Sequence, residues 1–241
     1  MRAGGAFDGF SQKSLDFLRE LEANNNKPWF EEHKHVYRDF LLQPMQRLVA
    51  DLSDFMLTID PYFETAPAVG KTISRIYRDT RFSKDKSPFR SSIWFTFKRP
   101  SAEWQDAPAY FFELSPRSYR FGMGFYSASK TTMDTFREMI DTRPDEFRRA
   151  ISFYPKQRYF TVEGDRYKKV LDPEKPADIL EWYQRKNLYL VCNRAIDHRL
   201  FSPELVRDLT EGFGLLADFY RFLLSIKEKK GAGFHETGRR H

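Results

Sequence analysis

Residues 109–126 read AYFFELSPRSYRFGMGFY and show an alternating pattern of apolar side chains. In a β-strand successive side chains point to opposite faces, so every second residue shares one face. The alternation predicts strands over 109–114 and 119–126, joined as a hairpin by the turn residues Ser115 to Ser118. A third strand is predicted over 92–98, where Ile93, Phe95 and Phe97 share a face. The middle of the chain is therefore expected to form an antiparallel sheet.

Helical spacing of apolar residues lies on both sides of this stretch in the sequence. Residues 11–24 predict a helix capped by Ser11, and Asn26 is expected to cap a second helix that Pro44 kinks or restarts. Ser202-Pro203-Glu204 is a helix start, and one final helix is expected to run to about residue 227. These features predict an α+β fold, with a central antiparallel sheet flanked by N-terminal and C-terminal helices.

Shorter elements are expected between the sheet and the final helix. Residues 129–140 and 178–185 have helical spacing, and 189–192 is a compact apolar strand. Gly164-Asp165 predicts a turn between two short strands within 158–170.

The domain organisation is predicted from the absence of a linker. No stretch rich in Pro, Gly or Ser divides the chain, so residues 1–230 are predicted to form a single domain. Residues 231–241 are rich in Gly and charge and are predicted to be a disordered tail.

The composition excludes several classes of protein. The 241 residues include 40 Lys and Arg against 34 Asp and Glu, and only one Cys. One Cys forms no internal disulfide, and no apolar run is long enough for a membrane span, so a cytoplasmic protein without membrane association is expected. The five His are scattered, so no metal site is predicted. Val69-Gly70-Lys71-Thr72 lacks the earlier Gly of a phosphate-binding loop, and no cofactor is predicted.

The positive charge is concentrated in one segment. Residues 71–90 hold seven basic and two acidic residues, a net charge of +5, whereas residues 1–60 have a net charge of −3. The planar guanidinium of Arg matches a carboxylate or phosphate with two donors, so this segment predicts an anion site. Phe82 and Phe89 are expected to anchor it to the core. The candidate anion-binding residues are Arg75, Arg78, Arg81, Lys84, Lys86 and Arg120.

Asp79 and Asp85 within the segment have two interpretations. They orient or neutralise their basic neighbours, or they are the acid-base residues of a reaction. The predicted strand 119–126 adds a second feature, because glycine in a strand allows a ligand or a packed helix to come close. A ligand pocket would have the walls Trp29, Tyr37, Gly122, Gly124 and Tyr126.

Three functions are compatible with these features. The first is a pocket for an anionic small molecule that carries phosphate or carboxylate, with or without catalysis. The second is an interaction module that docks an acidic partner through the same basic segment. The third is nucleic-acid binding, which the modest net charge of +6 and the acidic residues 1–60 disfavour. The sequence does not decide whether a reaction is catalysed, and it gives no oligomeric state.

Several motifs resemble those of one protein family. They are Asn25 to Tyr37 (NNKPWFEEHKHVY), Tyr77 to Phe89 (YRDTRFSKDKSPF), Gly122 to Tyr126 (GMGFY) and Gly164 to Val170 (GDRYKKV). Together with the final helix, they resemble a bacterial and fungal family of conserved hypothetical proteins, domain of unknown function family 2461. The resemblance covers about residues 7–226 and implies a single α+β domain without an assigned activity. Phe89 stands where members often carry Tyr, and His33 where they often carry Asn.

Overall fold

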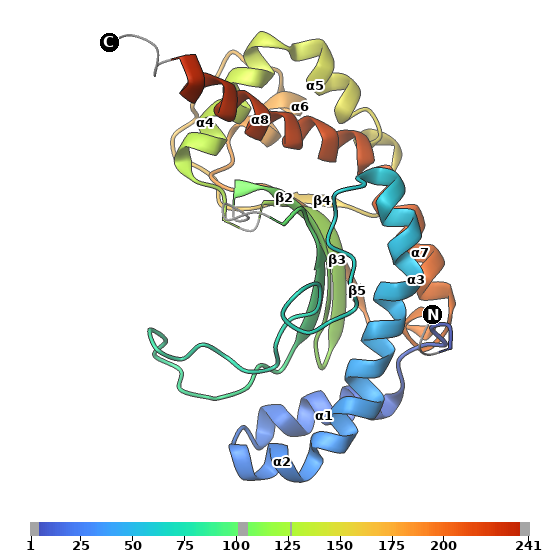
Figure 1. The fold of residues 1–241 in the computed structure, drawn as a ribbon. Helices are drawn as coiled ribbons and strands as arrows, with labels where there is room; N and C mark the ends of the chain where they lie inside the picture. The colour runs from blue at the N-terminus through green and yellow to red at the C-terminus, as the bar shows by residue number, and fades with distance from the viewer. Residues whose placement is uncertain (1–4, 101–105, 126, 237–241) are drawn as a thin grey trace. The chain divides into compact units, whose positions relative to one another are not determined.

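The computed structural model describes residues 5–100, 106–125 and 127–236, with side chains up to residue 226. Five strands pair in the order β1-β2-β3-β5-β4. In the chain this antiparallel sheet lies between N-terminal and C-terminal helices, so the predicted α+β class is confirmed (Figure 1). The strands are β1 (Ile93–Phe97), β2 (Pro108–Leu114), β3 (Ser118–Phe125), β4 (Thr161–Glu163) and β5 (Tyr189–Ala195).

The strands form where the side chains alternate. Every second residue of β1 and β2 is buried, as the pattern predicts. The Ser115 amide donates to the Ser118 carbonyl at 2.9 Å and closes the hairpin between β2 and β3. The prediction of two strands around Gly164 is wrong in part, because β4 pairs with β5 instead. The chain after Gly164 contributes only an isolated bridge between Arg166 and Arg185.

The N-terminal helices begin and end near the predicted caps. Ser11 and Ser14 form a capping box on α1, and the Asn26 side chain accepts the Trp29 amide at 3.0 Å on α2. The helix restarts at Pro44 as one of the two predicted alternatives has it, because a new α-helix begins at Gln43 with Pro44 in its first turn, where its missing donor is tolerated. The helices are α1 (Gln12–Ala23), α2 (Lys27–Val36), the π-helix η1 (Tyr37–Leu42) and α3 (Gln43–Ile59).

Contacts between residues group into two compact units that interleave along the chain. Unit 1 holds residues 1–97, 111–121 and 193–211, and unit 2 holds residues 98–110, 122–192 and 212–241. Stacked aromatic rings fill the core of unit 1, where the Phe95 and Phe112 centroids lie 5.5 Å apart. The single domain over residues 1–230 stays a prediction.

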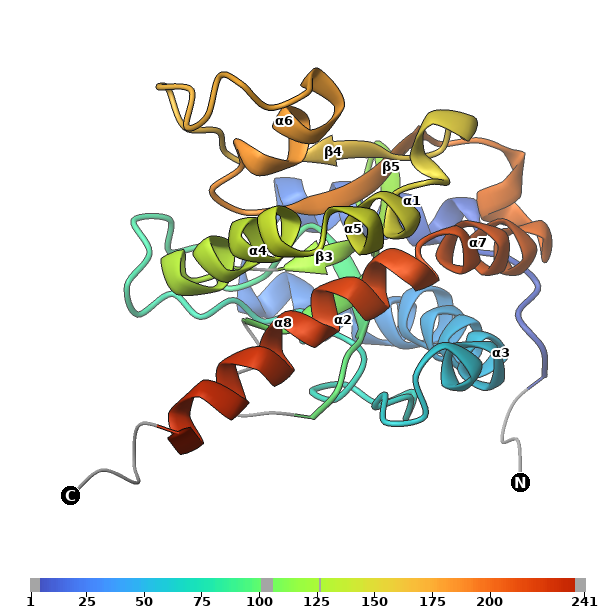
Figure 2. The same ribbon diagram turned by 90° about the horizontal axis from the view of Figure 1, so that it is seen from above.

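Unit 2 has a helical layer in which α4, α5 and α8 pack against one another (Figure 2). The rings of Phe147 and Trp182 meet edge to face inside this unit, with centroids 5.9 Å apart. The remaining helices of the chain are α4 (Lys130–Thr142), α5 (Pro144–Ala150), η3 (Tyr154–Lys156), α6 (Ala177–Tyr183), η4 (His198–Phe201), α7 (Glu204–Leu215) and α8 (Ala217–Glu236).

The predicted final helix is in fact two helices. The break between α7 and α8 follows Gly212 and Gly214, and glycine lowers helix stability. The backbone of α8 continues to Glu236, past the expected end near residue 227, and so overlaps the expected tail. Residues 237–241 lie outside the described part, and the disordered tail over 231–241 stays a prediction. No helix in the described ranges is long and apolar enough to cross a bilayer.

Candidate functional site: the basic arm

Residues 75–90, here called the basic arm, form a hairpin-like loop in unit 1. The loop is the long blue-green segment at the lower left of Figure 1. Its two sides are joined at the base by an antiparallel bridge between Tyr77 and Phe89. The Arg78 amide donates to the Pro88 carbonyl at 2.9 Å, and the Arg90 amide donates to the Ile76 carbonyl at 2.8 Å. The base of the arm is therefore held by backbone hydrogen bonds like those of an antiparallel pair of strands. Residues 79–87 form its tip.

The base of the arm is fixed to the N-terminal helices. The Asn25 side chain accepts the Phe89 amide and donates to the Phe89 carbonyl, both at 3.0 Å. The Phe89 ring is 1% exposed and stacks on Phe30 of α2 at a centroid distance of 4.3 Å. The expected anchoring of Phe89 is thus confirmed. The role of Asn25 is not predictable from the sequence, because a pair of hydrogen bonds across 64 residues leaves no local pattern.

Trp29 and Tyr37, two of the expected pocket walls, belong to the same aromatic cluster. Trp29 stacks on His33 at 4.1 Å, and Tyr37 lies 5.6 Å from Phe30. Burial, together with the neighbouring Tyr77, raises the pKa of Tyr37 to about 12. Tyr37 packs as a neutral side chain. The cluster contacts the base of the arm, where Phe30 packs against Tyr77 and Phe89.

The two carboxylates of the arm bind two of its arginines. Asp79 accepts the guanidinium of Arg81 at 2.7 Å, and this hydrogen bond lowers the pKa of Asp79 to about 2. Hydrogen bonds from Ser87, and then an ion pair with Arg78, lower the pKa of Asp85 to about 2. Of the two interpretations of these acids, the geometry favours the one in which they orient and neutralise their basic neighbours.

The remaining charges of the arm are less constrained. Lys86 donates to the Thr80 carbonyl at 2.9 Å and closes the tip. Arg75 and Lys84 are exposed, and their side chains form no ion pair with any residue in the described ranges. Phe82 was expected to anchor the arm, but its side chain is 94% exposed, so that expectation is wrong.

The other expected site residues contact strands of the sheet. Arg120 projects from β3 and pairs with Glu113 of β2 at 2.6 Å, so its ion pair is made within the hairpin. A Cβ atom on Gly122 would lie 1.9 Å from the Leu190 carbonyl, and one on Gly124 would lie 2.4 Å from the Tyr189 Cα. The element that comes close to the glycines is therefore β5, neither a ligand nor a helix. Tyr126 lies outside the described residues.

One comparison with known proteins decides the family. The profile of the conserved hypothetical protein family DUF2461 matches residues 13–222. The chain belongs to this family. The resemblance seen in the sequence motifs is thereby confirmed, and all of the arm lies within the matched range of this DUF2461 member. No curated protein matches the chain.

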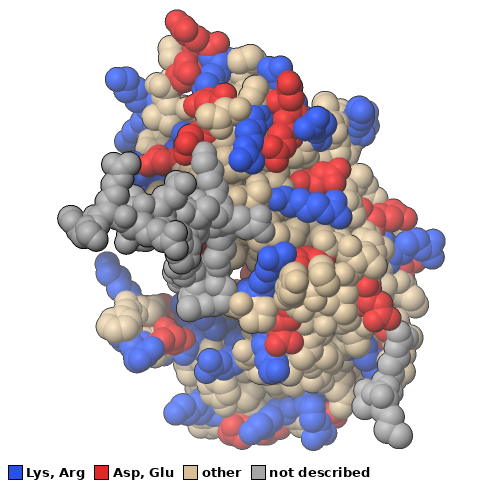
Figure 3. Space-filling view, turned by 45° about the horizontal axis from the view of Figure 1, so that its top comes forward, with Lys and Arg blue, Asp and Glu red and all other residues tan. Residues whose placement is uncertain are grey.

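Charged side chains of both signs bear on what this DUF2461 member could bind. Figure 3 shows basic and acidic side chains interspersed over the face in view. Among the described residues, no three His, Cys, Asp or Glu side chains come close enough to hold a metal ion.

Unit 1 also holds a buried polar cluster that the sequence analysis missed. The Tyr119 hydroxyl donates to Asp197 at 3.1 Å, and Asp197 also binds Arg199. Asp208 is 7% exposed and pairs with Arg194 at 3.2 Å. Burial raises the pKa of Asp208, and burial also raises that of Tyr119. These residues all lie within unit 1, and the second carboxylate oxygen of Asp208 is buried without a hydrogen-bond partner among the described residues. An unsatisfied buried oxygen agrees with the raised pKa of Asp208.

Proposed function

We propose that the basic arm is a docking element for a protein partner with an acidic surface. The partner would contact the tip, residues 79–87, through carboxylates that meet the exposed cations. An apolar contact to Phe82 would lie at the centre of the interface. No covalent chemistry is part of this proposal.

The exposure of Phe82 carries the proposal. A large aromatic side chain that is 94% exposed leaves much apolar surface in water. Phe and other aromatic residues, together with Arg, are enriched at the buried core of protein interfaces. Phe82 stands between Arg81 and Lys84, and both of these are exposed. A buried interface would cover the ring and use the charges together.

The rigid base of the arm supports the same function. The Asn25 clamp and the Phe30–Phe89 stack hold the base in place before a partner arrives. A preorganised element loses less conformational freedom on binding, so more of its contact energy appears as affinity. The ion pairs within the arm are exposed, and such pairs contribute only about 0–1 kcal/mol each. Carboxylates of a partner can therefore replace Asp79 and Asp85 at small cost.

A labelled acidic peptide tests the proposal. The probe is a fluorescein-labelled peptide of alternating Glu and Leu, and binding is measured by fluorescence anisotropy as salt is raised. Wild-type protein is expected to bind, with an affinity that falls with salt because screening weakens exposed charge pairs. Phe82→Ala is expected to weaken binding by roughly 10-fold, the effect of a contact of about 1.4 kcal/mol. Lys84→Gln is expected to weaken it less and to reduce the salt dependence.

Tyr62→Ala is the matched control, because Tyr62 is another exposed aromatic residue, 68% exposed, in the turn after α3. This variant should bind like wild type. Equal binding by Phe82→Ala and wild type would contradict the proposal. So would a single-stranded oligonucleotide that binds the arm when the peptide does not, which would favour the nucleic-acid alternative.

A small anion in place of a protein is the second candidate. It is favoured by the exposed Arg75 and Lys84, whose charges no carboxylate in the described ranges neutralises. Inorganic phosphate tests it directly. Shifts of the arm's amide resonances at millimolar phosphate, lost in Arg75→Gln, would support a free anion as the ligand.

The proposed setting of this interaction is the cytoplasm. The one cysteine, Cys192, is buried, and a single cysteine forms no disulfide within the chain, which suits a reducing compartment.

A further inference from the structure

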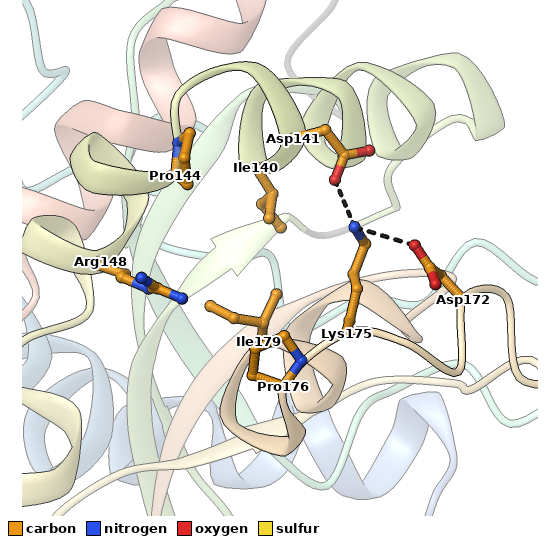
Figure 4. Close-up of a pocket in the computed structure, with 8 residues that line it drawn as sticks. All are labelled: Ile140, Asp141, Pro144, Arg148, Asp172, Lys175, Pro176 and Ile179. Carbon is orange, nitrogen blue, oxygen red and sulfur yellow. Dashed lines mark hydrogen bonds and ion pairs between the residues drawn. The ribbon is translucent and has the colours of Figure 1, made fainter.

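A groove of about 460 Å³ lies in unit 2 between the junction of α4 and α5 and the segment that leads into α6 (Figure 4). Its floor is apolar and is made by the side chains of Ile140 and Ile179, which are 3% and 5% exposed. Charged side chains stand at its two ends. The groove shares no residue with the basic arm, and the proposed function does not use it.

One end of the groove has a net negative charge. The Lys175 ammonium lies 2.7 Å from Asp141 and 3.2 Å from Asp172, so one cation faces two carboxylates. The Tyr183 hydroxyl donates to the second oxygen of Asp141 at 2.9 Å. The hydrogen bond from Lys175 to Asp141 helps to raise the pKa of Lys175, which therefore stays protonated. The three charges leave one negative charge at this end.

The other end of the groove is positive. Arg148 of α5 directs its guanidinium into the groove toward Ile179 (Figure 4). Within the described ranges this side chain forms no hydrogen bond or ion pair, although Arg143 of the same region pairs with Glu146. A guanidinium offers five donors in a planar fork that fits a carboxylate with two parallel hydrogen bonds. Arg148 is thus available to a ligand.

From this arrangement we infer that the groove binds a zwitterionic small molecule with an apolar body. The ligand's carboxylate pairs with Arg148, and its ammonium binds the oxygens of Asp141 and Asp172. The carbon chain between these groups covers Ile140 and Ile179. The lining has two basic and two acidic side chains, so an overall neutral ligand with separated charges matches it. A phosphate dianion would meet repulsion at the acidic end.

A probe of matching chemistry tests the inference on the full chain. The probe is 6-aminohexanoate, whose carboxylate and ammonium are separated by five methylene groups. Binding is followed by amide chemical shifts in ¹H–¹⁵N spectra, because a ligand this small is expected to bind with a Kd on the order of millimolar. The shifts should concentrate on residues 140–148 and 172–179. Hexanoate and hexylamine each lack one charged group and should bind at least about 10-fold more weakly, since a hydrogen bond to a charged group contributes about 1.5–3 kcal/mol.

Two variants assign the ends of the groove. Arg148→Gln is expected to lose 6-aminohexanoate and hexanoate binding, whereas its exposed neighbour Arg149→Gln should behave like wild type. Asp172→Asn should weaken 6-aminohexanoate binding and leave hexanoate binding unchanged. The inference is overturned if Arg148→Gln binds the probe as wild type does, or if hexanoate binds as tightly as 6-aminohexanoate. Wild-type spectra that show no shift at 50 mM probe would overturn it as well. Peptide binding to the arm is unaffected by any of these results.

Discussion

At the scale of single residues, the behaviour of the arm depends on two carboxylates. The six basic residues of the arm, with only two acids, suggest a strongly positive segment. The acids lie close to two of the arginines and remove much of that charge locally. Arg75 and Lys84 are exposed and pair with no carboxylate in the described ranges, which a count along the sequence does not show. The arm thus carries two arginines that are paired with its own carboxylates, together with other cations that are not.

The pKa values of Asp79 and Asp85 test this pairing. Both lie at about 2, below the ordinary value of 3.8, so both carboxylates are still mostly charged at about pH 3. Arg81→Gln removes the largest contribution at Asp79 and should move the pKa of Asp79 upward toward 3.8. The pKa of Asp85 should not change in that variant. Side-chain ¹³C shifts followed from pH 6 to about pH 1 pass the midpoints of both groups in one sample.

A second variant separates charge from local hydrogen bonding. Hydrogen bonds from Ser87 lower the pKa of Asp85 more than the Arg78 ion pair does. Arg78→Gln should therefore raise the pKa of Asp85 by less than Arg81→Gln raises that of Asp79. An equal rise in the two variants would show that the ion pairs dominate at both positions, contrary to the structure.

At the scale of elements, the two glycines of β3 explain how β5 packs. Glycine leaves room for a neighbouring backbone, and the Leu190 carbonyl and Tyr189 Cα lie where Cβ atoms would stand on Gly122 and Gly124. The sequence shows that something approaches these positions but not what it is. The pairing partner of a strand is set by a contact across more than sixty residues, which leaves no local signal.

Gly122→Ala is expected to destabilise the chain strongly. The new Cβ would stand 1.9 Å from a backbone oxygen of β5, and neither strand can move away without losing hydrogen bonds. Overpacking of a core typically costs about 1–3 kcal/mol, and this contact falls at the upper end or beyond. Urea unfolding monitored by circular dichroism measures the change. Gly5→Ala is the control, because nothing lies within 4 Å of its Cβ position. Comparable stability of the two variants would rule out the close β3–β5 approach.

The sequence predicted those elements that depend on local signals. The caps at Ser11 and Asn26, the alternation in β1 and the β2–β3 hairpin depend on neighbouring residues, and each is present. The partner of β4 and the break between α7 and α8 were not predicted. In the site, Phe89 was placed correctly and Phe82 was not, since both are aromatic residues next to charges and only the tertiary fold distinguishes them. The groove of unit 2 is lined by residues from three segments, so no local sequence pattern predicts it.

At the scale of the whole molecule, the pH dependence of the free energy of unfolding should reflect the buried cluster of unit 1. The cluster joins Tyr119 of β3 to Asp197, Arg199 and Asp208, and these residues come from separate parts of the chain. Buried carboxylates whose pKa values differ between the folded and unfolded states link global unfolding to pH. The two acids of this cluster are shifted in opposite directions, so their contributions to the free energy of unfolding oppose each other.

Asp197 and Asp208 are expected to give opposite pH dependences. Burial by itself would raise the pKa of Asp197. Hydrogen bonds from Arg199 and Tyr119 outweigh burial, so the pKa of Asp197 is lowered. The folded state therefore gains stability from Asp197 above its unfolded pKa and loses it as pH falls through the folded pKa. Burial raises the pKa of Asp208, so its stabilising contribution is present at low pH and is lost as pH rises through the folded pKa.

Urea unfolding of wild type, Asp197→Asn and Asp208→Asn between pH 3 and pH 7 measures these two contributions. The stability difference between wild type and Asp197→Asn should grow as pH rises, because only the wild type gains from ionising this carboxyl. The difference between wild type and Asp208→Asn should shrink over the same change, because ionisation of a buried carboxyl disfavours the wild-type fold. Parallel curves for the two variants would contradict the assignment of opposite shifts. The neighbouring Arg194 and Arg199 stay charged throughout this range. The difference between the two variants' pH dependences therefore reports the ionisation of Asp197 and Asp208 alone.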